Sequence, residues 1–246
     1  MTEIGSRLRG FNYHCTHGTL SFGALPFVLI QLSVLLVFTT YFSWVGLALC
    51  AASYLVRMFA ITGFYHRYFS HQTYKMGRVM QFVAGFLGAS AVQKGPLWWA
   101  SNHREHHKHS DTPEDPHSSK KGFWHSHFLW FMYRESGQTN YDSLRNFSKF
   151  PELIALERVW HLAPLTLALG LFAVGGWHYV VWGFFVPTFL VQNVTYCINS
   201  VTHIIGKQFF STGEDSRNHW FLGLLALLHW RARRPSRGRR CRLETR

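Results

Sequence analysis

Two long stretches of the chain carry no charged residue, and they dominate its hydrophobic pattern. The first covers residues 10–56 and the second covers residues 159–206. A membrane-crossing helix needs roughly 20 apolar residues, so each stretch is long enough for two helices and a short turn. The pattern therefore predicts two helical hairpins that span a membrane. Two buried hairpins of a soluble helical protein are the alternative interpretation.

Turn signals divide each stretch into two predicted spans. The turns are a Phe-Ser-Trp-Val-Gly segment at residues 42–46 and a Gly-Gly-Trp segment at residues 175–177. Both contain a Trp, which suits the interface between membrane and water, and neither contains Lys or Arg. The four predicted spans are residues 20–40, 47–64, 160–174 and 179–200.

The charge of the chain adds an orientation to this topology. Lys and Arg number 25 against 12 Asp and Glu, a net charge of +13. Every basic residue except Arg57 lies outside the predicted spans, on the side shared by the middle segment and both termini. The positive-inside rule therefore predicts that these parts are cytoplasmic. More than half of the excess charge lies in residues 229–246, and no basic helix or RNA-binding motif precedes it, so we expect no nucleic-acid partner.

The middle segment, residues 65–157, differs in kind from its flanks because it is polar and rich in His, Trp and Phe. Its apolar stretch at residues 79–92 is short and glycine-rich, which favours an interfacial or cap helix over a membrane crossing. Together the patterns predict an all-α membrane protein, with four transmembrane helices in two hairpins and a cytoplasmic, His-rich helical cap.

Histidines gather where the predicted spans meet the cap. His103, His106 and His107 have the i, i+3, i+4 spacing that places side chains on one helix face. His66 and His71, just after the second span, are five residues apart and can converge only near a helix end. A third segment with an imidazole lies at the end of the fourth span, where Asn199 and His203 are again one helical turn apart. These segments place imidazoles at the same membrane face.

The number and kind of these side chains indicate a metal centre. Neutral imidazole binds Zn, Cu, Fe and Ni. A structural zinc site would use four ligands and often Cys, but here at least six His converge and no Cys is near. This excess predicts more than one metal ion in a redox or oxygen-activating role.

Four motifs give the chain a specific family resemblance. They are His66-Arg-Tyr-Phe-Ser-His71, Asn-His103-Arg-Glu-His106-His107, Asp115-Pro116-His117 and Asn199-Ser-Val-Thr-His203. In order and spacing they resemble the membrane-bound fatty acyl-CoA desaturases, and in particular the bacterial form of the stearoyl-CoA Δ9 desaturases. The likeness extends from about residue 20 to residue 227.

The resemblance implies a reaction and its partners. The family removes two hydrogens from a fatty acyl chain, using O2 as co-substrate and two Fe ions in the cap. The substrate is fatty acyl-CoA or another acyl carrier in the lipid bilayer. Electrons come from an external donor such as ferredoxin, cytochrome b5 or a reductase.

Carried over position by position, the resemblance also assigns residues. Asn199 matches a residue that reaches iron through a water, and the matched iron ligands are His66, His71, His103, His106, His107 and His203. Gln93, Trp99 and Thr195 match residues that enclose the bend of the acyl chain. Tyr54 and Met58 match positions near the closed end of the acyl tunnel. Ordinary core or lipid-facing packing is the alternative for these last five.

The chain departs from the family at its C-terminal end. The family carries a third His box, H-x-x-H-H, whose histidines fall at about Ala232, Pro235 and Ser236 of this chain. We therefore expect a desaturase domain at residues 1–227 and an aberrant basic tail at residues 228–246, which has the composition of an out-of-frame translation. A basic tail that binds anionic lipid is the alternative. Without the third box, two irons would lack three nitrogen ligands.

These observations lead to one functional hypothesis and its rivals. The first is oxygen-dependent desaturation of a long-chain acyl chain, at position Δ9 by resemblance. A lipid hydroxylase of the same His-box superfamily fits the same boxes. A catalytically inactive, truncated or frameshifted desaturase fits the missing third box. A His-lined metal transporter is disfavoured because the histidines lie in the cap and not within the spans.

Overall fold

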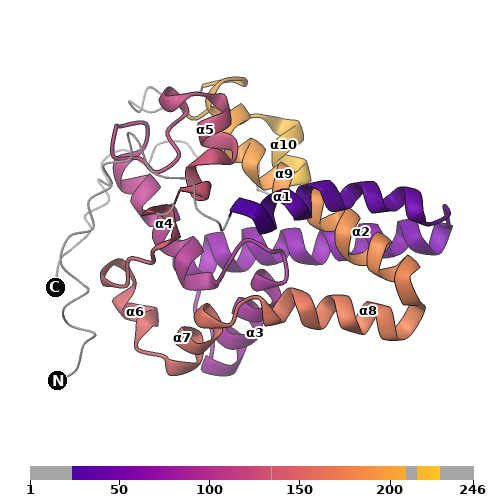
Figure 1. Cartoon of the computed structure of the whole chain (residues 1–246). Coiled ribbons are helices and arrows are strands. Elements are labelled where there is room, and N and C mark those ends of the chain that lie inside the picture. The colour runs from indigo at the N-terminus through magenta and orange to yellow at the C-terminus, as the bar shows by residue number, and fades with distance from the viewer. Residues whose placement is uncertain (1–23, 134, 209–214, 228–246) are drawn as a thin grey trace.

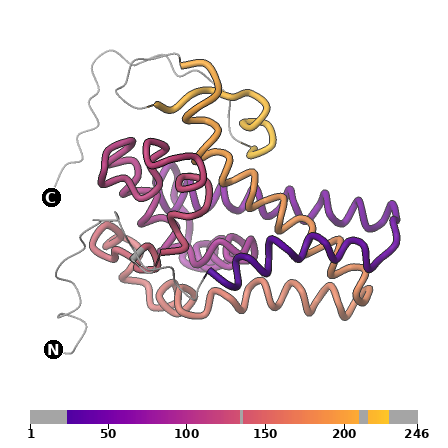
Figure 2. Tube along the Cα trace, turned by 45° about the horizontal axis from the view of Figure 1, so that its top comes forward, coloured from indigo at the N-terminus to yellow at the C-terminus, as the bar shows by residue number. Residues whose placement is uncertain are grey.

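The computed structural model describes residues 24–133, 135–208 and 215–227. Regular structure in these ranges is helical, apart from isolated β-bridges such as that between Lys207 and Asn218. The long apolar helices run lengthwise side by side, and the shorter helices gather at one end of them (Figure 1 and Figure 2). The all-helical prediction is confirmed for this part of the chain.

The first lengthwise stretch is α1 (Ala24–Leu32), which continues as the 3₁₀-helical η2 (Ser33–Thr39). None of its residues is buried within the protein, and Leu29 and Phe38 are 57% and 84% exposed. A continuous exposed apolar surface of this kind marks contact with another apolar phase, such as a membrane. The first four residues of the predicted span, 20–23, lie outside the described residues.

The second stretch is α2 (Trp44–Phe59), which continues without a break as the π-helical η3 (Ala60–Ser70). Its start is fixed by Ser43, whose Oγ accepts a hydrogen bond from the backbone N–H of Gly46 at 2.9 Å. The turn is therefore shorter than the sequence predicted, since Trp44 already belongs to the helix. At the other end the helix runs past residue 64 into the first His box.

The last lengthwise stretch folds back on itself. In α8 (Leu162–Val180) the backbone leaves helical geometry at Gly175 (φ −145°, ψ 19°) and Gly176 (φ 63°, ψ −155°). The second of these conformations is accessible in practice only to glycine. The chain reverses there and returns as η8 (Val181–Phe185), α9 (Val186–Ser200) and η9 (Val201–His203) (Figure 1). The predicted Gly-Gly-Trp turn thus coincides with the break.

Two helical stretches, Trp44–Ser70 and Leu162–His203, are long and apolar enough to cross a membrane, and Ala24–Thr39 is a shorter apolar helix. The sole charged residue along these stretches before the His boxes is Arg57, which is 2% exposed. Its guanidinium donates to the backbone carbonyls of Ser90 and Phe184 at 3.3 and 3.2 Å and to Thr188 Oγ1 at 2.6 Å. These bonds satisfy the buried cation and tie α2 to α9 and the end of α3.

The remaining helices form the cap. They are α3 (Arg78–Ala89), α4 (Pro96–His109), η4 (Ser119–Lys121), α5 (Phe123–His127), η5 (Leu129–Met132), η6 (Glu135–Gly137), η7 (Asp142–Leu144), α6 (Arg145–Ser148), α7 (Pro151–Arg158) and α10 (Trp220–Leu225). α4, which carries the second His box, begins with Pro96 in its first turn. Glu157 of α7 accepts the backbone N–H of Leu97 at 2.8 Å, so a buried carboxylate caps this helix at its positive end.

Candidate metal centre and adjoining cavity

Four imidazoles from two helices meet at one point, and we call them the four-imidazole group: His66, His71, His103 and His107. The Nε2 atom of His71 lies 3.1 Å from that of His66 and 3.0 Å from that of His103. His107 Nε2 lies 3.0 Å from His103 Nε2. All four ligand atoms are within 4.8 Å of one another.

The register of the first helix explains how His66 and His71 converge. His66 belongs to the π-helical η3, and the backbone N–H of His71 donates to the carbonyl of His66 at 3.1 Å. This is the i→i+5 bond of a π-helix, whose wider turn brings residues five apart to the same face. His71 is also the residue that ends this helix, as the sequence required. His103 and His107 lie one turn apart on α4, as the spacing predicted.

A second group lies beside the first and contains His106, Asp115 and His117; we call it the carboxylate-backed group. His106 Nδ1 is 3.0 and 2.9 Å from the two carboxylate oxygens of Asp115. The ring of His117 stacks on that of His106, with centroids 4.1 Å apart. Since Nδ1 of His106 is held by the carboxylate, its Nε2 is the nitrogen left for a metal.

His203 lies at the edge of the carboxylate-backed group. Its ring centroid is 5.8 Å from that of His106. Its Nδ1 is 3.4 Å from Oδ1 of Asp111, but the two atoms are not aligned for a hydrogen bond. The six predicted imidazoles thus divide four to two, with a carboxylate near each of the two.

The surroundings of the four-imidazole group favour neutral imidazoles. Burial, together with neighbouring imidazoles, holds the pKa of His103 well below its usual range and lowers the pKa of His107 to about 4. Burial alone would raise the pKa of Asp115, but the hydrogen bond from His106 and the proximity of His117 bring it down to about 2. At neutral pH the four-imidazole group therefore offers unprotonated nitrogens, and Asp115 is ionised. Neutral imidazole and carboxylate are donors that transition metals such as iron or zinc bind.

A cavity of about 310 Å³ adjoins both groups. His103 and His117 form part of its wall, and Asn199 lines it on the α9 side. The rest of the lining is mainly apolar and aromatic, with contributions from Phe27, Ile30, Trp98, Trp130, Phe131, Trp160 and Tyr196. A cavity of this kind suits an apolar chain placed against the metal-binding side chains.

The three residues assigned to the bend of an acyl chain are brought together in this cavity wall. Gln93 Nε2 donates to Thr195 Oγ1 at 3.0 Å, and Trp99 Nε1 donates to Gln93 Oε1 at 3.3 Å. The indole of Trp99 also stacks on His103, with centroids 5.0 Å apart and planes at 24°. The wall of the cavity and the four-imidazole group are therefore one connected unit.

Tyr54 and Met58 lie apart from this cavity. Met58 is fully buried in the apolar core below the cap, and Tyr54 packs against the same core. The hydroxyl of Tyr54 donates to the backbone carbonyl of Leu225 at 2.8 Å. The structure brings these two residues together in a core against which Trp99 of the cavity wall also packs, although neither of them lines the cavity.

Asp111, Asp115 and His117 had no role in the sequence analysis beyond the motif that two of them share. The signal was available, because an acidic loop directly follows the second His box. Asp115 is fully buried and also accepts the backbone N–H groups of Asp111 and His117 at 2.9 and 3.0 Å. A buried carboxylate beside a His box is the usual partner of a metal-binding imidazole.

Comparison with known proteins decides the family. A family model described as "Fatty acid desaturase" matches residues 42–231, which is most of the chain. This chain belongs to the fatty acid desaturase family. Membership confirms the resemblance inferred from the His boxes.

Individual desaturases show the same relationship. The chain is 34% identical over 213 residues to the palmitoyl-monogalactosyldiacylglycerol delta-7 desaturase of Arabidopsis thaliana. The matched region covers 84% of the chain and 57% of that desaturase. It is 33% identical to the sn-2 palmitoyl-lipid 9-desaturase of Nostoc sp. (strain 36), over 75% of the chain and 67% of that desaturase. With the acyl-CoA C20 Delta5-desaturase of Anemone leveillei the identity is 33%, over 75% of the chain and 60% of that desaturase. The chain thus spans between 57% and 67% of the length of these relatives.

Proposed function

We propose that the described fold performs oxygen-dependent desaturation of a long-chain fatty acyl chain at a centre of two His-ligated irons. The observation that carries this proposal is the shared wall of the cavity. Trp99 contacts both His103 and Gln93, and Gln93 is hydrogen-bonded to Thr195 in the same wall. An acyl chain in this cavity would lie beside the metal-binding nitrogens.

The protein's own residues bind and orient the chain. When bound, iron supplies the activation of O2 that breaking an unactivated C–H bond requires, because acid–base groups cannot break such a bond. We propose that the irons are held by His66, His71, His103, His106, His107 and His203, with Asn199 acting through a water. Phe27, Trp98 and Trp130 exclude water from the cavity. Gln93, Trp99 and Thr195 fix which carbons face the metals.

The acyl carrier and the position of the double bond form a finer part of the proposal. We propose a fatty acyl-CoA substrate and Δ9 regiochemistry, with Tyr54 and Met58 near the end of the bound chain. An acyl group esterified in a membrane lipid is the second substrate class, because the relatives include both acyl-lipid and acyl-CoA desaturases. An external donor such as ferredoxin, cytochrome b5 or a reductase would supply electrons.

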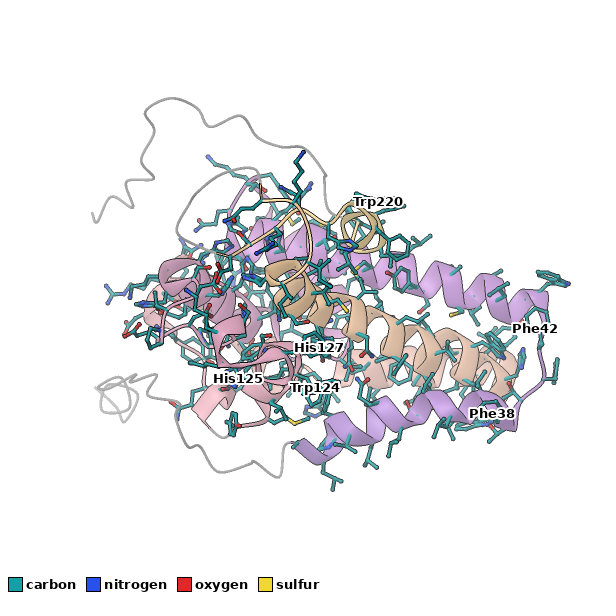
Figure 3. All side chains as sticks on the ribbon, turned by 90° about the horizontal axis from the view of Figure 1, so that it is seen from above. Phe38, Phe42, Trp124, His125, His127 and Trp220 are labelled. Atoms are coloured by element: carbon teal, nitrogen blue, oxygen red, sulfur yellow. The ribbon has the colours of Figure 1, made fainter. Side chains whose placement is uncertain are left out.

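We further propose that the lengthwise helices cross the membrane four times, with the cap and both termini in the cytoplasm. Exposed apolar side chains support this placement, among them Leu29 and Phe38 on the first stretch and Leu169 and Val174 on α8. The chain reverses at residues 40–43 and at Gly175–Gly176, away from the cap. Figure 3 shows Phe38 and Phe42 at the end opposite Trp124 and His125 of the cap.

A second candidate is a desaturase fold without turnover. The sequence carries no H-x-x-H-H after His219, and residues 228–246, where this box is expected, lie outside the described residues. Iron held by the remaining side chains alone would have an incomplete ligand set. The 246-residue chain would then insert in membranes and bind lipid or metal without forming an unsaturated product.

One experiment separates the two candidates. A desaturase-deficient host would express the 246-residue chain and, in parallel, a version whose reading frame is shifted near codon 228. We expect the shifted frame to encode H-x-x-H-H and to yield unsaturated acyl chains in lipid extracts, while the chain as printed yields none. His103→Ala in the shifted version is the matched negative control. Unsaturated product from the printed chain would refute the second candidate, and alcohol instead of alkene would indicate a hydroxylase.

A further inference from the structure

The wall of the acyl cavity contains a lysine that the proposed reaction does not use. Among the described residues that line the cavity, Lys94 is the only Lys, Arg, Asp or Glu. Its ammonium Nζ lies 4.1 Å from the ring centroid of Trp98, a cation–π contact. Within the described part of the chain, no hydrogen bond or ion pair joins this ammonium to another group. A partly buried cation has lost some of its water, so an anionic partner would stabilise it.

The backbone holds this lysine in a conformation that favours glycine. Lys94 has φ 64° and Val92 has φ 59°, both in the left-handed region. Two side chains hold the segment in place. The hydroxyl of Tyr65 donates to the carbonyl of Lys94 at 3.1 Å, and Gln192 Nε2 donates to the carbonyl of Val92 at 2.8 Å. Residues held in such conformations cluster at ligand-binding and catalytic sites, so Lys94 is a candidate for contact with a ligand.

We propose that Lys94 binds an oxyanion of the acyl carrier and so selects anionic acyl substrates over uncharged ones. The inference rests on the proposed desaturation, because it takes the cavity to be the acyl site. It deepens that function by naming the chemical class of the carrier. The phosphates of CoA, the phosphate of a phospholipid and the carboxylate of a free fatty acid all supply such an oxyanion, whereas a galactolipid with an uncharged sugar headgroup does not.

Glu157 is close enough to attract Lys94 but is engaged elsewhere. Its Oε2 accepts the backbone N–H of Leu97 at 2.8 Å, at the start of α4. Burial lowers the pKa of Lys94 to about 8, and the attraction of Glu157 offsets part of that effect. Lys94 therefore remains mainly protonated at neutral pH, with its three N–H donors available to an incoming acceptor.

The position of Lys94 suits the carrier end of an acyl chain. Its ammonium lies against Trp98, which precedes His103 by five residues on α4, a rise of about 7.5 Å along the helix. The indole N–H of Trp98 donates to the carbonyl of Ser136 at 2.7 Å, and the next residue, Gly137, lines the cavity and is exposed. The cavity thus reaches the surface beside Trp98. A carrier held there leaves room for several methylenes before the metal-binding nitrogens.

The test measures binding of radiolabelled acyl probes to the full 246-residue chain in an uncharged detergent. The probes form three pairs, each with a charged and an uncharged member. They are stearoyl-CoA with stearoyl-pantetheine, distearoylphosphatidylglycerol with distearoyl monogalactosyldiacylglycerol, and stearate with stearyl alcohol. We expect the charged member of at least one pair to bind at least about tenfold more tightly, the effect of one charge-assisted hydrogen bond. The pair that shows this preference identifies the source of the oxyanion.

Variants of Lys94 decide whether its ammonium causes the preference. Lys94→Met should reduce binding of the charged probe to the level of its uncharged partner, while binding of the uncharged probe shows that the variant is folded. Lys94→Arg keeps the cation and should keep the preference. Lys75→Met, at an exposed position, removes the same net charge and is the matched control. The proposal is wrong if no pair shows a preference, if Lys94→Met retains it, or if Lys75→Met reduces it equally.

The two proposals fail in different ways. If all six probes bind and the members of each pair bind equally, the cavity remains an acyl site and only the role of Lys94 is overturned. If none of the probes binds, the cavity is not an acyl site and both proposals are wrong. Product formation by the frame-shifted version tests desaturation independently of these binding measurements.

Discussion

His106 and Asp115 form the shortest link between an imidazole and a carboxylate in the described part of the cap, with Nδ1 2.9 Å from Oδ2. The carboxylate is fully buried and makes four contacts of 2.9–3.0 Å, two with His106 and one each with the backbone N–H groups of Asp111 and His117. Asp115 therefore orients the imidazole of His106 and, through the two backbone N–H groups, holds the conformation of the loop at residues 111–117.

Replacing Asp115 by Asn should lower the free energy of unfolding by about 2 kcal/mol, because an amide cannot accept from all of these donors and leaves a buried group unpaired. Chemical unfolding in detergent measures the loss. Asp142→Asn is the control, since that carboxylate is exposed and its bond to Arg145 should contribute less than about 1 kcal/mol. Equal effects at the two sites would contradict the buried role of Asp115.

Arg57→Met should destabilise the fold more strongly, by about 3 kcal/mol or more. Methionine is an unbranched apolar side chain that fills part of the same space. It leaves the carbonyls of Ser90 and Phe184 without their hydrogen-bond donor. Thermal unfolding in detergent would show the effect, with Lys75→Met as an exposed control. A melting temperature unchanged by Arg57→Met would mean that water or lipid replaces the guanidinium.

Met58→Ala tests the closed end of the acyl tunnel. In a version with the third His box restored, we expect a shift of preference towards longer acyl chains, because the deleted side chain frees space for further methylenes. Each buried methylene contributes about 0.8 kcal/mol. Product chain lengths would be measured by gas chromatography, with Val56→Ala, on the exposed face of the same helix, as control. An unchanged profile would place the end of the tunnel elsewhere.

The proposed topology predicts which positions a membrane-impermeant thiol reagent reaches from outside intact cells. Phe42→Cys and Val174→Cys, both highly exposed at the two reversals, should react. Lys120→Cys, exposed in the cap, should react only after the cells are permeabilised. If the Lys120→Cys variant reacted in intact cells, the cap would lie outside the cell, which would contradict the proposed orientation.

Acid should destabilise the metal-free protein. The pKa of His107 is lowered to about 4, and burial lowers the pKa of His71 and His103, while an unfolded His titrates near 6.5. Between these values the unfolded chain binds protons that the folded chain does not, so the unfolding free energy decreases as pH falls from about 6.5 to about 4. Melting curves at several pH values measure this, and His107→Gln should flatten the dependence. A stability independent of pH over this range would contradict the lowered pKa values.

Much of the architecture was readable from the sequence, because charge-free length and glycine placement are local signals. Gly175 and Gly176 lie at the break, and the second His box is helical with the expected facing side chains. The start of the second helix was misjudged by a few residues, since the cap formed by Ser43 outweighed the turn character of Trp44 and Gly46.

The missed parts of the candidate site depend on contacts between segments distant in sequence or on backbone geometry without a residue signature. No residue pattern in residues 60–70 distinguishes a π-helix from an α-helix. The wider turn depends on how the helix packs in the fold, which the local sequence does not show. The pairing of Asp111 with His203 joins residues ninety-two positions apart. The role of the cavity wall was carried by resemblance, and the hydrogen bonds among Gln93, Trp99 and Thr195 now give that wall a physical basis.

The π-helical register of Ala60–Ser70 makes the five-residue spacing of the first His box sensitive to length. Residues five apart on an α-helix differ by about 140° in direction, whereas the wider turn of a π-helix places them on the same face. Deleting one residue between His66 and His71 would therefore be absorbed by a change to ordinary α-helix, which again aligns the two rings. If one residue were added, no regular helix would bring the two rings back to the same face. Length variation in this box should thus be tolerated in one direction only.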